Sequence, residues 1–146
     1  RHFYQKTDKK QLADYYAKMR DSVRKNNDKI NTEMGLDSPL LVPSVHAFKK
    51  LFSEMEEQLQ SHDWLAGNSY SLADISLVVY LTRLGSFQMK PLWSDMIALN
   101  KWFEKIVARP AYQKAVVEWG DITEEKRRVE GEAAFERLKK IWQQDS

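Results

Sequence analysis

Cysteine is absent from this 146-residue chain, and glycine and proline are scarce, with five and four copies. Without cysteine, neither a disulfide framework nor a thiolate metal cluster can form. Charge of one sign is also lacking, because 23 basic residues against 21 acidic ones leave a formal charge of only +2. So small an excess gives no general footprint for nucleic acid. We therefore expect no nucleic-acid partner, and a cytoplasmic location is compatible with a chain that needs no oxidising compartment.

Long hydrophobic runs are missing as well. The longest candidate, ISLVVYLTRLGSF, is interrupted by Thr82, Arg83, Gly85 and Ser86, and it falls short of the ~18 apolar residues of a membrane span. The opening residues, RHFYQKTDKK, contain neither an initiator methionine nor the apolar core of a signal peptide. We expect no membrane partner, and we expect the chain to be a piece of a longer protein.

Helical spacing is what the sequence does contain. Over residues 8–34 the apolar residues recur at separations typical of one helical face. They are Leu12, Tyr15, Tyr16, Met19, Val23, Ile30 and Met34. Asp8 can cap the start of this helix, Gly35 can end it in a left-handed conformation, and the Asn26-Asn27 pair can interrupt it. Signals for β-hairpins are weak throughout, so we predict an all-α fold.

A second helix is predicted from about Pro43 to Ser61, after the proline-containing loop GLDSPLLVPS. Its apolar positions, 45, 48, 52, 55 and 59, form a heptad-like seam of the kind that packs against another helix. The glutamates at positions 54, 56 and 57 are expected to face water.

The stretch GNSYSLAD joins a polar turn to an apolar segment. Ser71 and Asp74 have the spacing of a capping box, in which a hydroxyl and a carboxylate each accept a hydrogen bond from a backbone N–H at the helix start. The segment from Ile75 to Leu84 is apolar almost all the way round, which predicts a helix buried at the centre of the domain. A general-base role for Asp74 is the alternative, although carboxylates at helix starts are mostly structural.

Three motifs follow one another in a specific order along the chain. EMEEQLQSHDWLAG forms a helix end and a short link, and Leu65-Ala66-Gly67 is followed after three residues by Ser71-Leu72-Ala73-Asp74. LNKWFEKIVARPAYQKA, from Leu99 to Ala115, then gives a helix that ends in an ARP turn. This order resembles the C-terminal domain of the glutathione S-transferase family, closely over residues 43–118 and loosely over 8–42. The region before residue 43 is similar to the bacterial dehalogenase and β-etherase branches.

The resemblance implies a helical bundle around a buried central helix over residues 1–120, with a C-terminal helical extension over 121–146. It also implies a thioredoxin-like domain, absent from this chain, that would bind glutathione and activate its thiol. The intact protein would then conjugate or reduce a small hydrophobic electrophile and pair as a homodimer, while this chain alone would be inactive. The alternative is a non-catalytic binding or scaffold module that mediates protein assembly, a role that other relatives serve.

Aromatic and methionine side chains are candidates for an apolar substrate pocket. We select Tyr15, Tyr16 and Met19 on the first helix and Trp119 before the tail, because the related enzymes use that region and the tail for hydrophobic substrates. Plain core packing is the alternative interpretation for these side chains. The chain itself offers no catalytic residue.

No metal site is expected. The histidines, at positions 2, 46 and 62, are widely scattered, and the helix between the last two would hold them ~24 Å apart. In the ARP turn, Pro110 suits the first turn of a new helix and disfavours helix at Arg109. We interpret this turn as structural, and a ligand role for Arg109 is the less favoured alternative.

The tail, residues 121–146, is rich in charged residues that favour helix. Phe135, Leu138 and Trp142 share one helical face, and Gly131 is expected to weaken the middle. We interpret the tail as an amphipathic helix that lies on the domain or against a second subunit. A lid over the substrate cavity is the alternative.

Overall fold

The computed structural model describes residues 8–118 and 124–144. The chain divides into two compact units, Arg1–Ser44 and Val45–Ser146, and each is considered by itself. Over the described residues every named element is helical, and the only extended pairing is an isolated bridge between Trp64 and Gly67. The prediction of an all-α fold is therefore confirmed.

The described part of the first unit contains two helices where the sequence predicted one. They are α2 (Lys9–Lys18) and α3 (Ser22–Met34). One turn of 3-10 helix, η1 (Gly35–Asp37), follows α3. The break falls at Met19, which has an extended backbone, and at Asp21, whose carboxylate accepts a hydrogen bond from the Arg24 N–H at 3.0 Å. The expected interruption at Asn26-Asn27 is wrong, because a new N-cap at Asp21 starts α3 before that pair is reached.

The ends of these helices follow the sequence in part. Gly35 ends α3 with φ at +57°, a conformation that favours glycine. Asp8 does stand at the N-cap of α2, but its side chain makes no capping bond, and its carbonyl accepts from the Leu12 N–H at 2.9 Å. The turn toward the next helix is closed by Ser38, whose Oγ donates to Asn31 and accepts from the Leu40 N–H.

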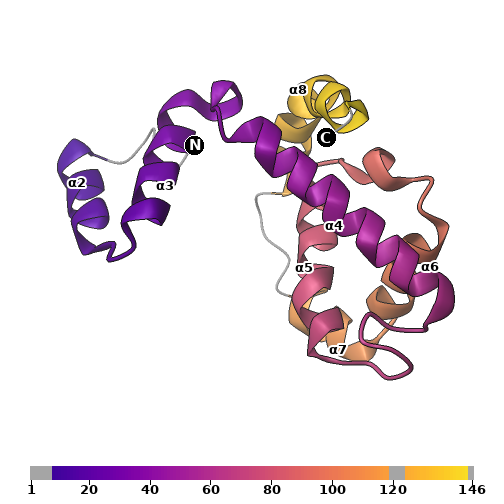
Figure 1. Ribbon diagram of the computed structural model, residues 1–146. Coiled ribbons are helices and arrows are strands. Elements are labelled where there is room, and N and C mark those ends of the chain that lie inside the picture. The colour runs from indigo at the N-terminus through magenta and orange to yellow at the C-terminus, as the bar shows by residue number, and fades with distance from the viewer. Residues whose placement is uncertain (1–7, 119–123, 145–146) are drawn as a thin grey trace. The chain divides into compact units, whose positions relative to one another are not determined.

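The second unit is built on α4 (Leu41–Ser61), which begins two residues before its predicted start, and on α5 (Leu72–Ser86). The remaining elements are the 3-10 turn η2 (Lys90–Trp93), α6 (Ile97–Val107), the short α7 (Pro110–Tyr112) with its π-helical continuation η3 (Gln113–Val117), and α8 (Glu124–Gln143). Within this unit, α7 and α8 lie at opposite ends (Figure 1). Residues from these elements and from the links between them form one apolar core: Phe52, Met55, Leu59, Trp64, Val78, Leu81, Met89, Trp93, Leu99, Trp102, Ile106 and Ala134.

The central helix α5 is buried on one side only. Asp74, Val78 and Leu81 face the core, whereas Leu72 and Val79 expose 78% and 50% of their surface. The expectation of a helix buried all the way round is thus corrected. The apolar residues of α5 extend around more of the helix surface than the described neighbouring elements cover.

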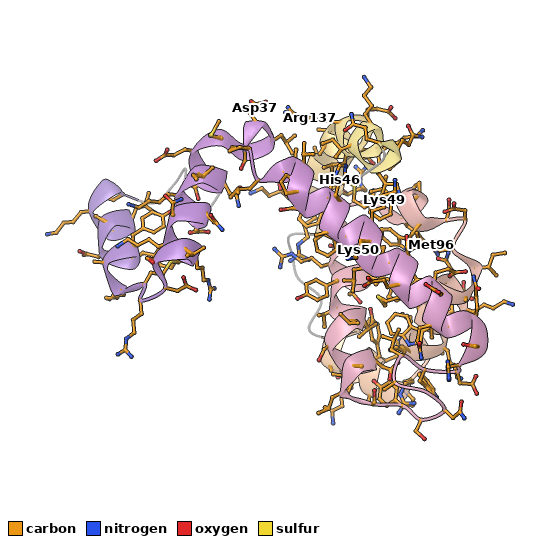
Figure 2. The ribbon with its side chains drawn as sticks, viewed as in Figure 1. Asp37, His46, Lys49, Lys50, Met96 and Arg137 are labelled. Atoms are coloured by element: carbon orange, nitrogen blue, oxygen red, sulfur yellow. The ribbon has the colours of Figure 1, made fainter. Side chains whose placement is uncertain are left out.

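The tail helix α8 packs on the second unit, as the amphipathic interpretation expects. Ala134 and Ile141 are buried, and the Trp142 ring lies 6.0 Å from that of Phe52, edge to face. Lys49 on α4, labelled in Figure 2, donates from Nζ to the Gln144 carbonyl at 2.9 Å. These contacts favour the first interpretation over a free lid.

Gly131 has a packing role that the sequence did not reveal. It is buried, and a Cβ at this position would collide with the backbone carbonyl of Phe87, just after α5. We expected Gly131 to weaken the helix. Its missing side chain also allows the backbones of α8 and Phe87 to approach closely.

Candidate functional site: the Asp74 hub and the aromatic first helix

The Asp74 carboxylate connects three segments of the second unit. Oδ1 accepts from the Leu65 N–H at 3.0 Å, in the link before α5, and from the Trp102 indole N–H at 2.8 Å, on α6. Oδ2 accepts from both the N–H and the hydroxyl of Ser71, at 2.8 and 2.9 Å. The Ser71 hydroxyl in turn accepts from the Ala73 N–H at 3.2 Å, which completes a capping box at the start of α5.

This environment gives Asp74 a structural role. Its side chain is fully buried. Burial raises the pKa of the Asp74 carboxyl, but the hydrogen bonds from Leu65, Trp102 and Ser71 outweigh that effect, so the pKa lies below its ordinary value. A general base needs a free lone pair within reach of a ligand proton, and this carboxylate is enclosed and fully engaged.

Glu56 was expected to face water, but it caps α6. Its Oε1 accepts from the Ala98 N–H at 3.1 Å and its Oε2 from the Leu99 N–H at 2.7 Å. The residue at the N-cap of α6, Met96, makes no side-chain capping bond. A carboxylate from α4 therefore satisfies N–H groups at the positive end of another helix. Only the absence of a polar residue at position 96 could have signalled this from sequence.

The ARP turn has the structure that was predicted. α6 ends at Val107, Arg109 is extended at the N-cap of α7, and Pro110 occupies the first turn. The Arg109 guanidinium lies over the Tyr70 ring, 3.9 Å from its centroid. This cation–π contact uses the side chain in packing the turn against the link before α5.

The tyrosine pair on α2 has two different environments. Tyr16 is 7% exposed, its hydroxyl lies 3.5 Å from the Thr32 hydroxyl on α3, and burial raises its pKa. Tyr15 is 39% exposed and meets the Tyr16 ring edge to face at 5.4 Å. Met19, at the C-cap of α2, is half-buried. Tyr16 thus packs α2 on α3, while Tyr15 and Met19 present apolar surface.

The expectations for Trp119, for a metal site and for a membrane span remain to be compared with the structure. Trp119 and His2 lie outside the described residues. Within those residues, no group of three or more His, Cys, Asp or Glu side chains is arranged to hold a metal ion. Over the same part of the chain, no helix is both long and apolar enough to cross a membrane.

The described part of the second unit includes two grooves. One, of about 460 Å³, separates the end of α4 from the start of α6 and has Glu56, Leu59, Ile97 and Lys101 among its lining residues. The other, of about 610 Å³, lies between η2 and α8. We call the second one the η2–α8 groove.

The fold and the hub define a class of protein, an all-helical domain whose central helix is closed by an internal capping box. Comparison with known families identifies that class more closely: the model for "Glutathione S-transferase, C-terminal domain" matches residues 39–110. Residues 39–110 are therefore a glutathione S-transferase C-terminal domain.

Three curated relatives illustrate the similarity. "FtsZ-localized protein A" of Caulobacter vibrioides is 37% identical over 59 residues, which are 40% of this chain and 25% of that protein. "Glutathione S-transferase TCHQD" of Arabidopsis thaliana is 30% identical over 95 residues, 64% of this chain and 36% of that protein. "Tetrachloro-P-hydroquinone reductive dehalogenase" of Sphingobium chlorophenolicum is 24% identical over 110 residues, 74% of this chain and 44% of that protein. The chain thus spans less than half of each relative. No solved structure matches it significantly.

Proposed function

We propose that this chain is the helical substrate-binding domain of a glutathione S-transferase-like protein. The intact protein would use glutathione to conjugate or reduce a small hydrophobic electrophile. The observation that carries the proposal is the family match over residues 39–110. Relatives named as a glutathione S-transferase and as a reductive dehalogenase support both types of reaction.

The proposed organisation places residues 1–120 in the helical domain and 121–146 in a C-terminal extension. Glutathione would be bound mainly by a thioredoxin-like domain outside this chain, and no described residue is assigned to it. The pairing of intact proteins into a homodimer and a cytoplasmic location belong to the same proposal, as expected for the family.

The apolar co-substrate would be held by Tyr15, Tyr16 and Met19, with Trp119 from the segment before the tail. The exposed ring of Tyr15 and the half-buried thioether of Met19 offer apolar contact surface. Tyr16 would act chiefly by fixing α2 on α3, since its ring is buried between them. Apolar pockets of this kind supply affinity, while polar groups elsewhere set orientation.

The test is conjugation of 1-chloro-2,4-dinitrobenzene and reduction of tetrachloro-p-hydroquinone by the intact protein with glutathione. Tyr15→Ala and Met19→Ala should raise the KM for the electrophile and leave the KM for glutathione unchanged. Gln11→Ala, at an exposed position of the same helix, is the matched control. If neither variant differs from this control, the assignment of the pocket is wrong.

The non-catalytic scaffold is the outcome that would replace this proposal. An intact protein that binds no glutathione in calorimetry would point to it. Residues 1–146 alone should show no turnover. Measurable conjugation by this chain alone would place the chemistry within the helical domain and contradict the proposed division of labour.

A further inference from the structure

We draw no further inference here: the strongest candidate, the exposed apolar face of α5 that Leu72, Ile75 and Val79 form, supports no proposal, because nothing in the part of the chain that the structure describes shows what covers it.

Discussion

The two ends of α5 are closed by different physical means. At its start, side chains supply the missing partners: the Ser71 hydroxyl and the Asp74 carboxylate accept hydrogen bonds from backbone N–H groups. At its end, the Schellman bonds from backbone N–H groups satisfy the Leu84 and Gly85 carbonyls, and the Ser86 hydroxyl donates to the Arg83 carbonyl at 2.7 Å. There Gly131 also allows α8 to lie close to Phe87. One end depends on directed polar groups, and the other depends on the absence of a side chain.

This difference explains why only the first end could be predicted. A capping box is local, and its residue types are diagnostic. The second end depends on a glycine that stands far along the chain, in a helix whose sequence alone makes glycine look unfavourable. The predictions below test this contrast, from the largest expected effect to the smallest.

Removing the hub carboxylate should have the largest effect. Asp74→Ala leaves the buried Trp102 indole N–H and the half-buried N–H groups of Leu65 and Ser71 without this acceptor, so we expect the free energy of unfolding to fall by about 4 kcal/mol. Urea denaturation followed by circular dichroism measures the loss. Ser76→Ala, at an exposed position of the same helix, should change stability little. A loss below about 1 kcal/mol for Asp74→Ala would contradict a central role for the hub.

The same hub predicts a pH dependence. The folded-state pKa of Asp74 lies below its ordinary value, so the carboxylate contributes stability above its unfolded pKa of about 3.9. That contribution is lost as the pH falls through the folded-state pKa. The stability difference between the parent and Asp74→Asn should stay constant from about pH 7 to 5.5 and shrink below about pH 4. Urea midpoints across this range measure it, and a difference that persists unchanged into strong acid would show that the charge is irrelevant.

At the other end of α5, two glycines should respond with opposite signs. Gly131→Ala places a methyl group against the Phe87 carbonyl and should lower the free energy of unfolding by about 2 kcal/mol. Gly85→Ala is the matched control, because a Cβ there meets nothing within 4 Å, and it should raise stability by up to about 1 kcal/mol. Thermal and urea unfolding distinguish the two. Equal effects would mean that α8 is not held by this close approach.

The cap of α6 extends the comparison to a side chain that acts from a distance. Glu56→Ala removes the acceptor for the Ala98 and Leu99 N–H groups and should cost about 1 kcal/mol, as the loss of an N-cap does. Glu57→Ala, an exposed neighbour on α4, should cost much less. Amide hydrogen exchange at residues 98 and 99 gives a local measurement, and unchanged protection there would contradict the assignment.

The smallest effect concerns Gln88. Its φ of +61° is strained for a residue with a side chain, so Gln88→Gly should raise the free energy of unfolding by a few tenths of a kcal/mol, roughly. Glu57→Gly, inside α4 and exposed, should instead lower it by about 1 kcal/mol. Urea unfolding measures both changes, provided that the parent and the variants have the same dependence of unfolding free energy on urea concentration. Destabilisation by both substitutions would show that Gln88 makes contacts that outweigh its strain.

The sequence predicted those parts of the fold that depend on neighbouring residues. Helical periodicity, Gly35, the Ser71 and Asp74 box, and the ARP turn are all local signals, and each has its expected structure. The break at Met19 was missed because Asp21 competes as an N-cap within an otherwise helical pattern. The exposed side of α5 was missed because hydrophobicity does not reveal which neighbours are present to cover it.

For the candidate sites as well, local contacts could be predicted from sequence, whereas contacts made by the tertiary fold could not. The box predicted one of the bonds to Asp74, that from the Ser71 N–H. It did not predict the bond from the Ser71 hydroxyl, nor those from Leu65 and Trp102, which the tertiary fold brings together. The sequence does not distinguish Glu56 from a solvated glutamate, because its role depends on the position of α6. Tyr15, Tyr16 and Met19 could be selected by type, yet the division into one packing residue and two apolar contact residues needed coordinates. Trp119 stays a prediction.

The Phe52 ring meets three other aromatic rings edge to face, those of Phe48, Trp93 and Trp142. Phe48 in turn meets Tyr80, so the run connects α4, α5, η2 and α8. Rings held in such fixed, asymmetric surroundings couple their electronic transitions. The second unit therefore carries its own optical reporter: if α8 detaches while the other helices persist, the near-ultraviolet dichroism will change before the far-ultraviolet signal does.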